Sequence, residues 1–434
     1  MAEKHRSNPS EISRNCIRNY LKDFHLPSSN IQHSSKMNHF ISVSEAKKII
    51  ETQIFRTEKV TLSILEAQGS YTSEPIFATL DVPSFDNSAM DGYGFRFDDL
   101  ADFSELNVTE IIPAGISKID FVLNRGEAVR IFTGAKIPDG VDTVIMQEKT
   151  TRIVDRIQFN DDEISKGENI RLKGSQTKVG TKIIEENTLV NHAVIGFLAG
   201  FGIEKIGVYK KLNIGLLYTG NELVEIGKPL LDGEIYNSNT YTLQSALSEI
   251  NHQFSFVYHV EDTEEATFSA IKNGLETVDI LLITGGISVG DYDYVKPALE
   301  KIGVSELFYK IRQKPGKPLY FGKLEEKFVF ALPGNPASVF SCYHQYVKPF
   351  LLGCFGRKEF DEEQDFAISE SFAKKKNKDQ TQFLKAFYTK GKVLILNAQE
   401  SYKMDSVAQA NCLVEFPEGA TEINIGEKVK IWKV

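Results

Sequence analysis

The chain has 434 residues, of which 41% are apolar and 25% charged, and its formal net charge is −9. This length predicts two to four globular domains, strand-length apolar runs argue against a membrane span, and the acidic balance argues against general nucleic-acid binding. Four widely separated cysteines without a CxxC pair argue against a zinc cluster or disulfide framework and favour a cytoplasmic protein.

The first 165 residues divide into three parts. Residues 1–36 are polar and lack the apolar segment of a signal peptide, which predicts a disordered extension, with Met37 as an alternative start of translation. Ser42 and Glu45 form a capping-box pattern that predicts the start of a helix. Residues 69–165 contain short β-rich runs, clearest at 129–132, 143–146 and 157–159, which predict an inserted β domain.

The pattern of predicted secondary structure changes twice in the remaining sequence. Residues 166–210 end in a helical run at 192–201, and we expect them to join residues 37–68 in one discontinuous mixed domain. In residues 211–355, strand-like runs alternate with helical patterns at 240–250 and 293–302, which predicts an α/β domain with a mostly parallel sheet. The predicted strands are residues 214–218, 254–260, 280–283 and 328–332. Residues 356–434 return to short strands that predict a small β barrel, at 383–387, 393–396, 412–416 and 429–432.

Three polar or glycine-rich loops each follow a predicted strand of the α/β domain. They are Thr219-Gly220-Asn221-Glu222, the loop that begins Thr284-Gly285-Gly286-Ile287-Ser288, and Pro333-Gly334-Asn335-Pro336. The carboxyl ends of parallel strands lie on one edge, and glycines let backbone amides approach an anion there. Any one loop is explained by a tight turn, but three together favour an anion-binding site.

Acidic and basic residues accompany these loops. Glu222 and Asp293 are hard oxygen ligands suited to Mg²⁺, although a helix-start role explains each equally well. Lys310, Arg312 and Lys314 share one face if their segment is a strand, and two prolines stiffen the turn that presents Lys317. In an acidic chain, this basic run favours an oxyanion or phosphate clamp over a solvated face.

No sequence pattern for nucleophilic or histidine catalysis stands out. The chain lacks a Ser-His-Asp order, an HExxH motif, a P-loop and a GxGxxG motif. Two polar loops of the β region, around Asp91 and Thr133, have no chemical interpretation on their own. The remaining candidates favour transfer of a pre-activated group by electrostatics.

At these residues the chain resembles the molybdopterin molybdenumtransferases, which include the enzymatic domain of gephyrin. The similarity runs from about Val43 to Val434. It rests on several short motifs taken together: residues 86–93, 133–135, 219–223, 285–290, 314–318 and 333–336. The resemblance implies a molybdopterin-binding-like α/β domain and a homodimer whose active cleft lies between the α/β domain of one subunit and the β domain of the other.

The resemblance also implies a reaction and a set of site residues. Molybdate is inserted into adenylyl-molybdopterin with Mg²⁺, and AMP is released. The implied catalytic residues are Asp91, Thr133, Glu222, Asp293, Lys310 and Lys314, with Glu222 and Asp293 as metal ligands. The implied substrate-binding residues are Ser88, Thr219, Asp262, Gly285, Gly286, Ser288, Lys317, Pro333, Gly334 and Asn335. The molybdopterin adenylyltransferase and apo-molybdoenzymes are candidate partners.

Three positions depart from the family pattern. Asn221 replaces a usual Asp, Gly174-Ser175-Gln176 replaces a Gly-Glu-Asp run, and Lys385 replaces a usual Arg. The first two remove negative charge, and the third loses the bidentate guanidinium. Two alternatives therefore stay open: an adenylyltransferase acting one step earlier, which shares the α/β domain, and a molybdopterin-binding scaffold without catalysis.

Overall fold

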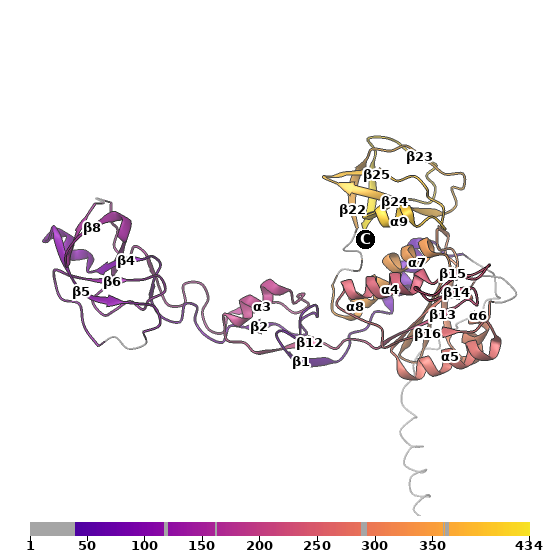
Figure 1. Cartoon of the computed structure of the whole chain (residues 1–434), viewed down its shortest axis with the longest axis horizontal. Helices are drawn as coiled ribbons and strands as arrows, with labels where there is room; N and C mark the ends of the chain where they lie inside the picture. The colour runs from indigo at the N-terminus through magenta and orange to yellow at the C-terminus, as the bar shows by residue number, and fades with distance from the viewer. Residues whose placement is uncertain (1–39, 117–119, 161–162, 288–292, 359, 361–363) are drawn as a thin grey trace, which may run out of the picture. The chain divides into compact units, whose positions relative to one another are not determined.

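The computed structural model describes residues 40–116, 120–160, 163–287, 293–358, 360 and 364–434 (Figure 1). The extension predicted at residues 1–36 and the candidate Ser288 lie outside these ranges.

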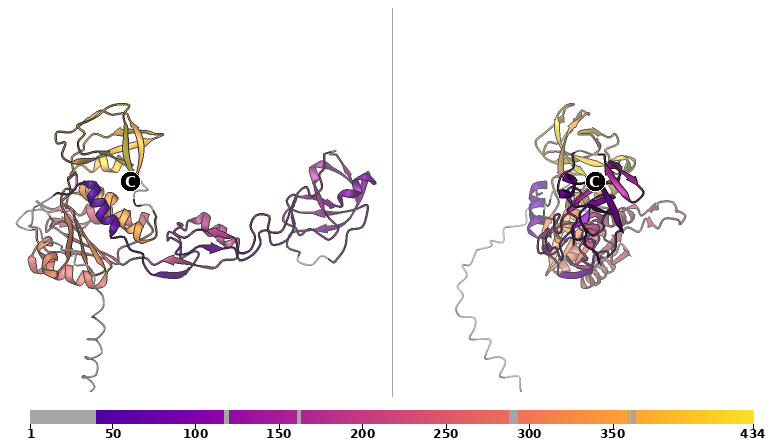
Figure 2. Two further views of the ribbon diagram at one scale, coloured as in Figure 1. Left: turned by 180° about the vertical axis from the view of Figure 1, so that it is seen from behind. Right: turned by 90° about the vertical axis from the view of Figure 1, so that its left-hand side faces the viewer.

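The first described helix, α2 (Val43–Thr52), begins where the capping-box pattern predicts. The Glu45 N–H donates to the Ser42 hydroxyl at 3.2 Å, and the Ser42 N–H donates to the Glu45 carboxylate at 2.7 Å. This reciprocal pair satisfies two amides that the helix itself leaves free. Val43, Ala46 and Ile50 are buried in the core of the α/β domain, and α2 lies beside α8 (Lys348–Cys354), as Figure 2 shows.

Two stretches distant in sequence pair through short antiparallel strands. β1 (Lys59–Ser63) pairs with β12 (Lys205–Tyr209), β2 (Ile76–Phe77) with β11 (Lys182–Ile184), and β3 (Asn87–Ser88) with β10 (Ile170–Arg171). Helix α3 (His192–Ala199) contributes Leu198 to the small core that it shares with the β1–β12 and β2–β11 pairs. Strand β1, and not the preceding helix, is therefore the element through which the early segment meets residues 166–210.

The three strands predicted in the β region are present in a six-stranded sheet with the order β7-β4-β6-β5-β9-β8. The bounds are β4 (Gly92–Phe95), β5 (Glu105–Ile112), β6 (Glu127–Ile131), β7 (Thr143–Met146), β8 (Thr150–Ile153) and β9 (Arg156–Phe159), with 3₁₀ turns η1 (Phe97–Ala101) and η2 (Gln147–Lys149). Val129 and its neighbour Ala128 belong to different apolar clusters, so both faces of the sheet are covered.

The central sheet has the order β16-β13-β17-β21-β20-β18, and its first four strands are parallel. Their bounds are β13 (Ile214–Thr219), β16 (Phe256–Val260), β17 (Ile280–Thr284) and β21 (Lys327–Leu332). The antiparallel strands β20 (Tyr320–Leu324) and β18 (Ser305–Tyr309) complete the other edge. The predicted mostly parallel sheet is therefore present, with an antiparallel addition that the sequence did not predict.

Alternate residues of the central strands enter two different cores. Leu216 and Leu282 pack with α2, α4 (Ser238–Glu249), α7 (Pro336–Cys342) and α8, whereas Leu217 and Leu281 pack with α5 (Glu264–Thr277) and α6 (Val295–Ile302). The sheet thus lies between two helical layers (Figure 1), which explains why its strands are apolar throughout. A π-helical turn, η3 (Tyr343–Val347), connects α7 to α8.

The segment that carries Lys310, Arg312 and Lys314 is not a continuous strand, so the condition under which the three side chains would share one face is not met. Strand β18 ends at Tyr309, Lys310 has a left-handed φ of 69°, and only the two-residue β19 (Gln313–Lys314) follows. A left-handed residue interrupts the pleat on which side-chain alternation depends. Arg312 instead bonds to the Phe40 carbonyl and, at 2.8 Å, to Glu418, so its charge holds the chain in place.

The C-terminal strands form a closed five-stranded barrel, because β24 pairs with both β25 and β26. The strands are β22 (Gln364–Ser369), β24 (Thr381–Thr389), β25 (Lys392–Ile395), β26 (Cys412–Phe416) and β28 (Lys428–Lys433), and all four predicted runs fall within them except for the end of the second. The smaller elements are β23 (Ala373–Lys374), β27 (Glu422–Ile423) and α9 (Asp405–Gln409). Throughout the described residues, every helix is too short or too polar to reach across a lipid bilayer.

An aromatic group at the centre of the α/β domain provides a test of this core. The fully buried ring of Phe321 lies 4.5 Å from that of Phe330 and 5.7 Å from those of Phe328 and Phe350. We expect Phe321→Ala to lower the free energy of unfolding by roughly 3–5 kcal/mol, because it removes a large side chain and leaves a cavity. Urea unfolding followed by the fluorescence of Trp432, which belongs to the same core, measures the change.

The matched control is Phe366→Ala in β22, where the side chain is 48% exposed. This change should alter stability by no more than about 0.5 kcal/mol. Equal destabilisation by the two variants would contradict the assignment of the core.

Candidate functional site

The three loops predicted to share one edge of the sheet are in contact. A Cβ built on Gly285 would lie 2.7 Å from the Thr219 carbonyl oxygen, and one built on Gly334 would lie 3.8 Å from the Gly285 Cα. The Gly285 N–H donates to the Leu332 carbonyl at 3.2 Å, and Gly285 and Gly286 have φ values of 86° and 60°. Only glycine fits this close packing and left-handed backbone, so backbone rather than side chains forms the centre of the site.

The first loop is fixed to the strand beside it. The Asn221 N–H donates to the Asp262 carboxylate at 2.9 Å, and the Asp262 N–H donates to the Asn221 side-chain oxygen at 3.3 Å. The substitution of Asn for the family's usual Asp therefore keeps an acceptor at this position while removing a charge beside Asp262. Glu222 is exposed, and Thr219 is buried against the glycine loop.

Asp293 and Lys310 lie near one tyrosine. The Tyr309 hydroxyl donates to the Ile287 carbonyl at 2.8 Å, and the Lys310 ammonium lies 4.7 Å from the centroid of the Tyr309 ring. Burial and the nearby Asp293 carboxylate raise the pKa of Tyr309. Tyr309 thus joins the glycine loop, an acid and a cation, a role that the sequence did not indicate.

The lysine loop, residues 310–318, packs against the helix that follows the third loop. Gly316 is buried, and a Cβ added there would lie 2.4 Å from the Cys342 sulfur at the end of α7. Lys314 and Lys317 are exposed, and the Lys317 ammonium lies 4.5 Å from the Phe40 ring centroid. The buried side of the loop is therefore packed, while Lys314 and Lys317 are exposed to solvent.

The third loop is held by a residue that the sequence analysis missed. The Asn239 side-chain amide donates to the Gly334 carbonyl at 2.7 Å, and its buried oxygen has no hydrogen-bond partner among the described residues. Pro333 is buried, whereas Asn335 is exposed at the N-cap of α7. Asn239 lies two residues after Asn237, the N-cap of α4, and a second asparagine so close to a cap was the available signal.

The two polar loops of the β domain meet one another. The Thr133 N–H and hydroxyl both donate to one Asp91 carboxylate oxygen at 2.7 Å, and these bonds lower the pKa of Asp91. Both residues are exposed. Ser88 is fully buried and donates to the Met90 carbonyl at 2.6 Å, so it shapes the loop from inside.

The other two family departures have structural roles. The buried Lys385 ammonium donates to the carbonyls of Ala398, Glu400 and Lys403 at 2.8–3.1 Å, which a single long cation can do without a guanidinium fork. Ser175 and Gln176 are exposed, and their N–H groups donate to turn carbonyls at 3.0 Å.

The acidic residues suit a metal that arrives with a ligand. Within the described ranges, no three His, Cys, Asp or Glu side chains gather closely enough to hold an ion by themselves. Mg²⁺ usually binds through one or two carboxylates, waters and substrate phosphates. The exposed Glu222 and the half-buried Asp293 fit that mode better than a preformed cage.

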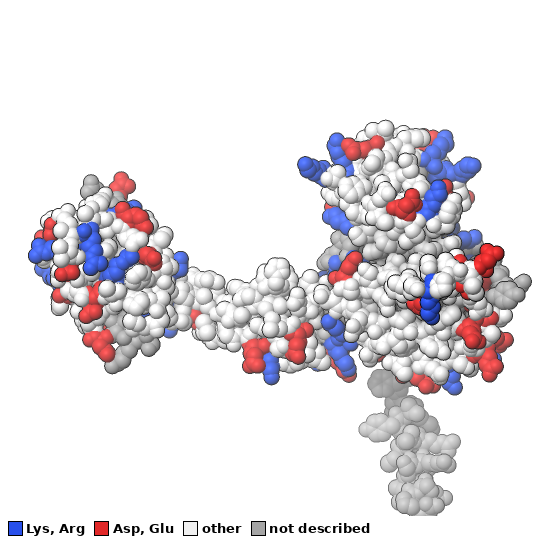
Figure 3. Space-filling model, viewed as in Figure 1, with Lys and Arg blue, Asp and Glu red and all other residues white. Residues whose placement is uncertain are grey.

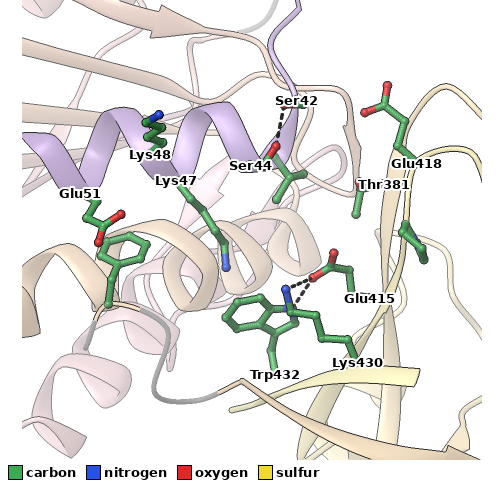
Figure 4. A pocket seen from close by; sticks show the side chains of 13 residues that line it. Ser42, Ser44, Lys47, Lys48, Glu51, Thr381, Glu415, Glu418, Lys430 and Trp432 are labelled. Atoms are coloured by element: carbon green, nitrogen blue, oxygen red, sulfur yellow. Dashed lines mark hydrogen bonds and ion pairs between the residues drawn. The ribbon is translucent and has the colours of Figure 1, made fainter. Parts of the chain in front are cut away.

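A separate cavity of 610 Å³ lies between α2 and the barrel (Figure 4). The Lys47 ammonium lies 3.1 Å from the centroid of the Trp432 ring, whose N–H donates to Glu415 at 2.9 Å, and Lys430 pairs with the same carboxylate at 3.3 Å. None of the predicted site residues lines it. Lys430 and Glu415 thus pair across the cavity wall, and Lys47 of α2 lies over a ring of the barrel, so the cavity marks a polar contact between the helix and the barrel.

Basic and acidic side chains lie in separate small groups on the face drawn in Figure 3, without a broad basic surface over its described residues. This distribution suits a small anion bound by a local lysine loop better than a nucleic acid.

The bonds to Asp91 predict a pH effect. Because they stabilise the carboxylate, their contribution to folding is complete above the ordinary Asp pKa and is lost as the pH falls through the lowered value. We expect Thr133→Ala to raise the pKa of Asp91 part of the way toward its ordinary value, because the hydroxyl bond is lost while the backbone N–H bond remains, whereas Thr133→Ser keeps the pKa low. Carboxyl-carbon NMR titration measures this pKa, and identical titrations of Thr133→Ala and the unaltered protein would contradict the assigned hydroxyl bond.

Comparison with known proteins matches nearly the whole described chain. Residues 41–202 match the MoeA N-terminal region (domain I and II), residues 215–353 a probable molybdopterin binding domain, and residues 370–434 the MoeA C-terminal region (domain IV).

Individual relatives agree over similar lengths. A molybdopterin molybdenumtransferase of Haemophilus influenzae is 34% identical over 88% of this chain and 96% of its own. One of Staphylococcus aureus is 31% identical over 90% and 95%. The crystal structure of the molybdopterin biosynthesis MoeA protein from Pyrococcus horikoshii OT3 has a TM-score of 0.77 and 27% identity, and covers 91% of this chain and all of that one. The resemblance drawn from the short motifs is thereby confirmed, and the chain belongs to the molybdopterin molybdenumtransferase (MoeA) family.

Proposed function

We propose that this protein inserts molybdate into adenylyl-molybdopterin, which yields molybdenum cofactor and AMP. Family membership supports this role. The observation that carries the proposal is the close packing of three strand-end loops at Gly285, with the acid Glu222 in the first loop and Lys310 linked to the glycine loop through Tyr309. Such a surface suits a polyanionic substrate, because backbone amides and ammonium groups both stabilise negative charge. The proposed reaction needs no covalent nucleophile from the protein.

The basic, neutral and acidic groups of the site have different roles in this reaction. The ammonium groups of Lys310, Lys314 and Lys317 bind molybdate and the pterin phosphate, and they neutralise the charge that develops between the two phosphates as AMP is released and the pterin keeps its own phosphate. The amides of the glycine loops orient the phosphates. Mg²⁺ would be held by Glu222 and Asp293 with the substrate, and when bound it polarises the phosphate and offsets repulsion from these carboxylates.

We further propose a homodimer in which Asp91 and Thr133 of one subunit face the α/β loops of the other. Support comes from apolar side chains exposed around α3: Phe197 is 37% exposed, Leu189 43% and Leu65 71%. In α3 itself only Leu198 is fully covered, although the helix is almost entirely apolar. A second copy with the same surface would remove these groups from water through a symmetric interface.

The proposed reaction also implies a source for its substrate and recipients for its product. We place the reaction in the cytoplasm, with substrate supplied by the molybdopterin adenylyltransferase and the product passed to apo-molybdoenzymes.

The two alternatives predict different behaviour. An adenylyltransferase would consume ATP and bare molybdopterin, but the matched MoeA regions on both sides of the molybdopterin-binding domain favour the later step. A scaffold would bind substrate tightly without releasing AMP under saturating molybdate and Mg²⁺. The exposed Glu222, Lys314 and Lys317 favour a catalytic site over such a scaffold.

Single changes in the charged groups test the reaction. We expect Lys314→Ala and Asp293→Asn each to lower kcat/KM for molybdate-dependent AMP release by at least about 100-fold, because each removes charge stabilisation from the reacting phosphate. AMP release is followed by chromatography with purified adenylyl-molybdopterin. The control Lys301→Ala removes a 62%-exposed lysine of α6 and should retain full activity. Full activity in both site variants would refute the site assignment.

Mixing two inactive variants tests the shared cleft. Asp91→Asn and Lys314→Ala subunits, unfolded and refolded together, should recover about a quarter of the unaltered activity, because about half of the dimers are mixed and each mixed dimer has one intact cleft. Adding Phe197→Glu to both subunits should prevent recovery by placing a charge in the apolar interface. If the mixture stays inactive although mixed dimers form, the cleft is not shared.

A further inference from the structure

The lysine loop is held by two consecutive buried hydrogen bonds that connect it to the π-helical turn η3. Gln313, which is 1% exposed, donates through its side-chain amide to the Gly316 carbonyl at 2.9 Å. Its side-chain oxygen accepts a hydrogen bond from the Tyr346 hydroxyl, and Tyr346 is fully buried in η3. Gln313 and Gly316 lie on either side of Lys314 and Pro315, so these hydrogen bonds fix both ends of the turn that carries Lys314.

The surrounding contacts leave this turn little freedom. Arg312 is bound to Glu418 on one side, and β19 pairs in parallel with Thr381–Gln382 of β24 on the other. Gly316 has a φ of 86° and no room for a Cβ between the Cys342 sulfur and the Gln313 amide. Lys314 and Lys317 are exposed while Gln313 and Gly316 beside them are buried, which is the arrangement expected of a preorganised binding loop.

The π-helical turn orients the Tyr346 side chain toward the lysine loop. A π turn inserts an extra residue, so every side chain after it is rotated relative to an uninterrupted α-helix. Two buried tyrosines of η3 consequently serve different neighbours: the Tyr343 hydroxyl donates to the Ala246 carbonyl of α4 at 3.0 Å, whereas Tyr346 reaches the lysine loop. π turns of this kind occur frequently at functional sites.

We propose that Tyr346 and Gln313 are positioning residues that hold the lysine loop in the geometry that binds molybdate. The proposal rests on the proposed function, because molybdate is the anion assigned to Lys314 and Lys317. Neither Tyr346 nor Gln313 touches substrate, since both side chains are buried behind the loop.

The test compares two tyrosines of the same turn. Tyr346→Phe should raise the KM for molybdate about tenfold while kcat falls less than about threefold, because the loop loses its fixed geometry but keeps its charges. The matched control Tyr343→Phe also removes a buried hydroxyl from η3, but its bond points to α4, so its KM should stay unchanged. Thermal midpoints of both variants report any general loss of stability.

Gln313→Met provides the second variant. If Tyr346 acts through Gln313, the double variant Tyr346→Phe/Gln313→Met should have the same KM as Gln313→Met alone, and independent roles would instead multiply the two increases. Equilibrium dialysis of molybdate against each variant, with adenylyl-molybdopterin absent, should show the same order of affinities.

The outcomes separate the two proposals. If the unaltered protein neither binds molybdate nor releases AMP, the proposed function fails. If it does both, and Tyr346→Phe matches Tyr343→Phe in KM and affinity, only the positioning role is overturned.

Discussion

The close approach of backbone at Gly285 is the constraint on which the candidate site depends. Thr219 lies against it from one strand end and Gly334 from another, so a side chain at this position would force the loops apart. The sheet beneath can hold them this close because its central strands are covered on both faces by packed helices. The rigid core therefore fixes the spacing of the loops, and the loops in turn fix where backbone amides can meet an anion.

Charge is arranged around this backbone in two ways. Some charged groups are used internally: Arg312 holds Glu418, Lys385 holds three carbonyls, and Lys47 covers Trp432. Others are left at the surface, notably Lys314, Lys317 and Glu222. The paired cations make the frame rigid, and the exposed ones can respond to a ligand. This division explains how an acidic chain can present a locally basic loop.

The departures from the family pattern are compatible with this frame. Asn221 keeps a hydrogen bond with Asp262 and removes a carboxylate from its side, which lessens repulsion between neighbouring acids. Lys385 needs only one flexible ammonium to reach three carbonyls of a single loop. Both positions therefore remain structurally satisfied without the residues that are usual in the family.

The sequence alone determined the features that depend on local chemistry. The capping box at Ser42 and Glu45, the apolar strands of the central sheet and the glycine loops at their ends follow from short-range preferences, and each is present where predicted. The short motifs together also determined the family. Tertiary structure decided which separated groups meet: Asn239 beneath Gly334, Tyr309 between Ile287 and Lys310, and Tyr346 on Gln313. It also ended β18 before Lys310 and packed the following loop against α7 and the barrel, so Lys310, Arg312 and Lys314 do not alternate along one strand. Such contacts join residues up to 95 positions apart in sequence, and no local pattern encodes them.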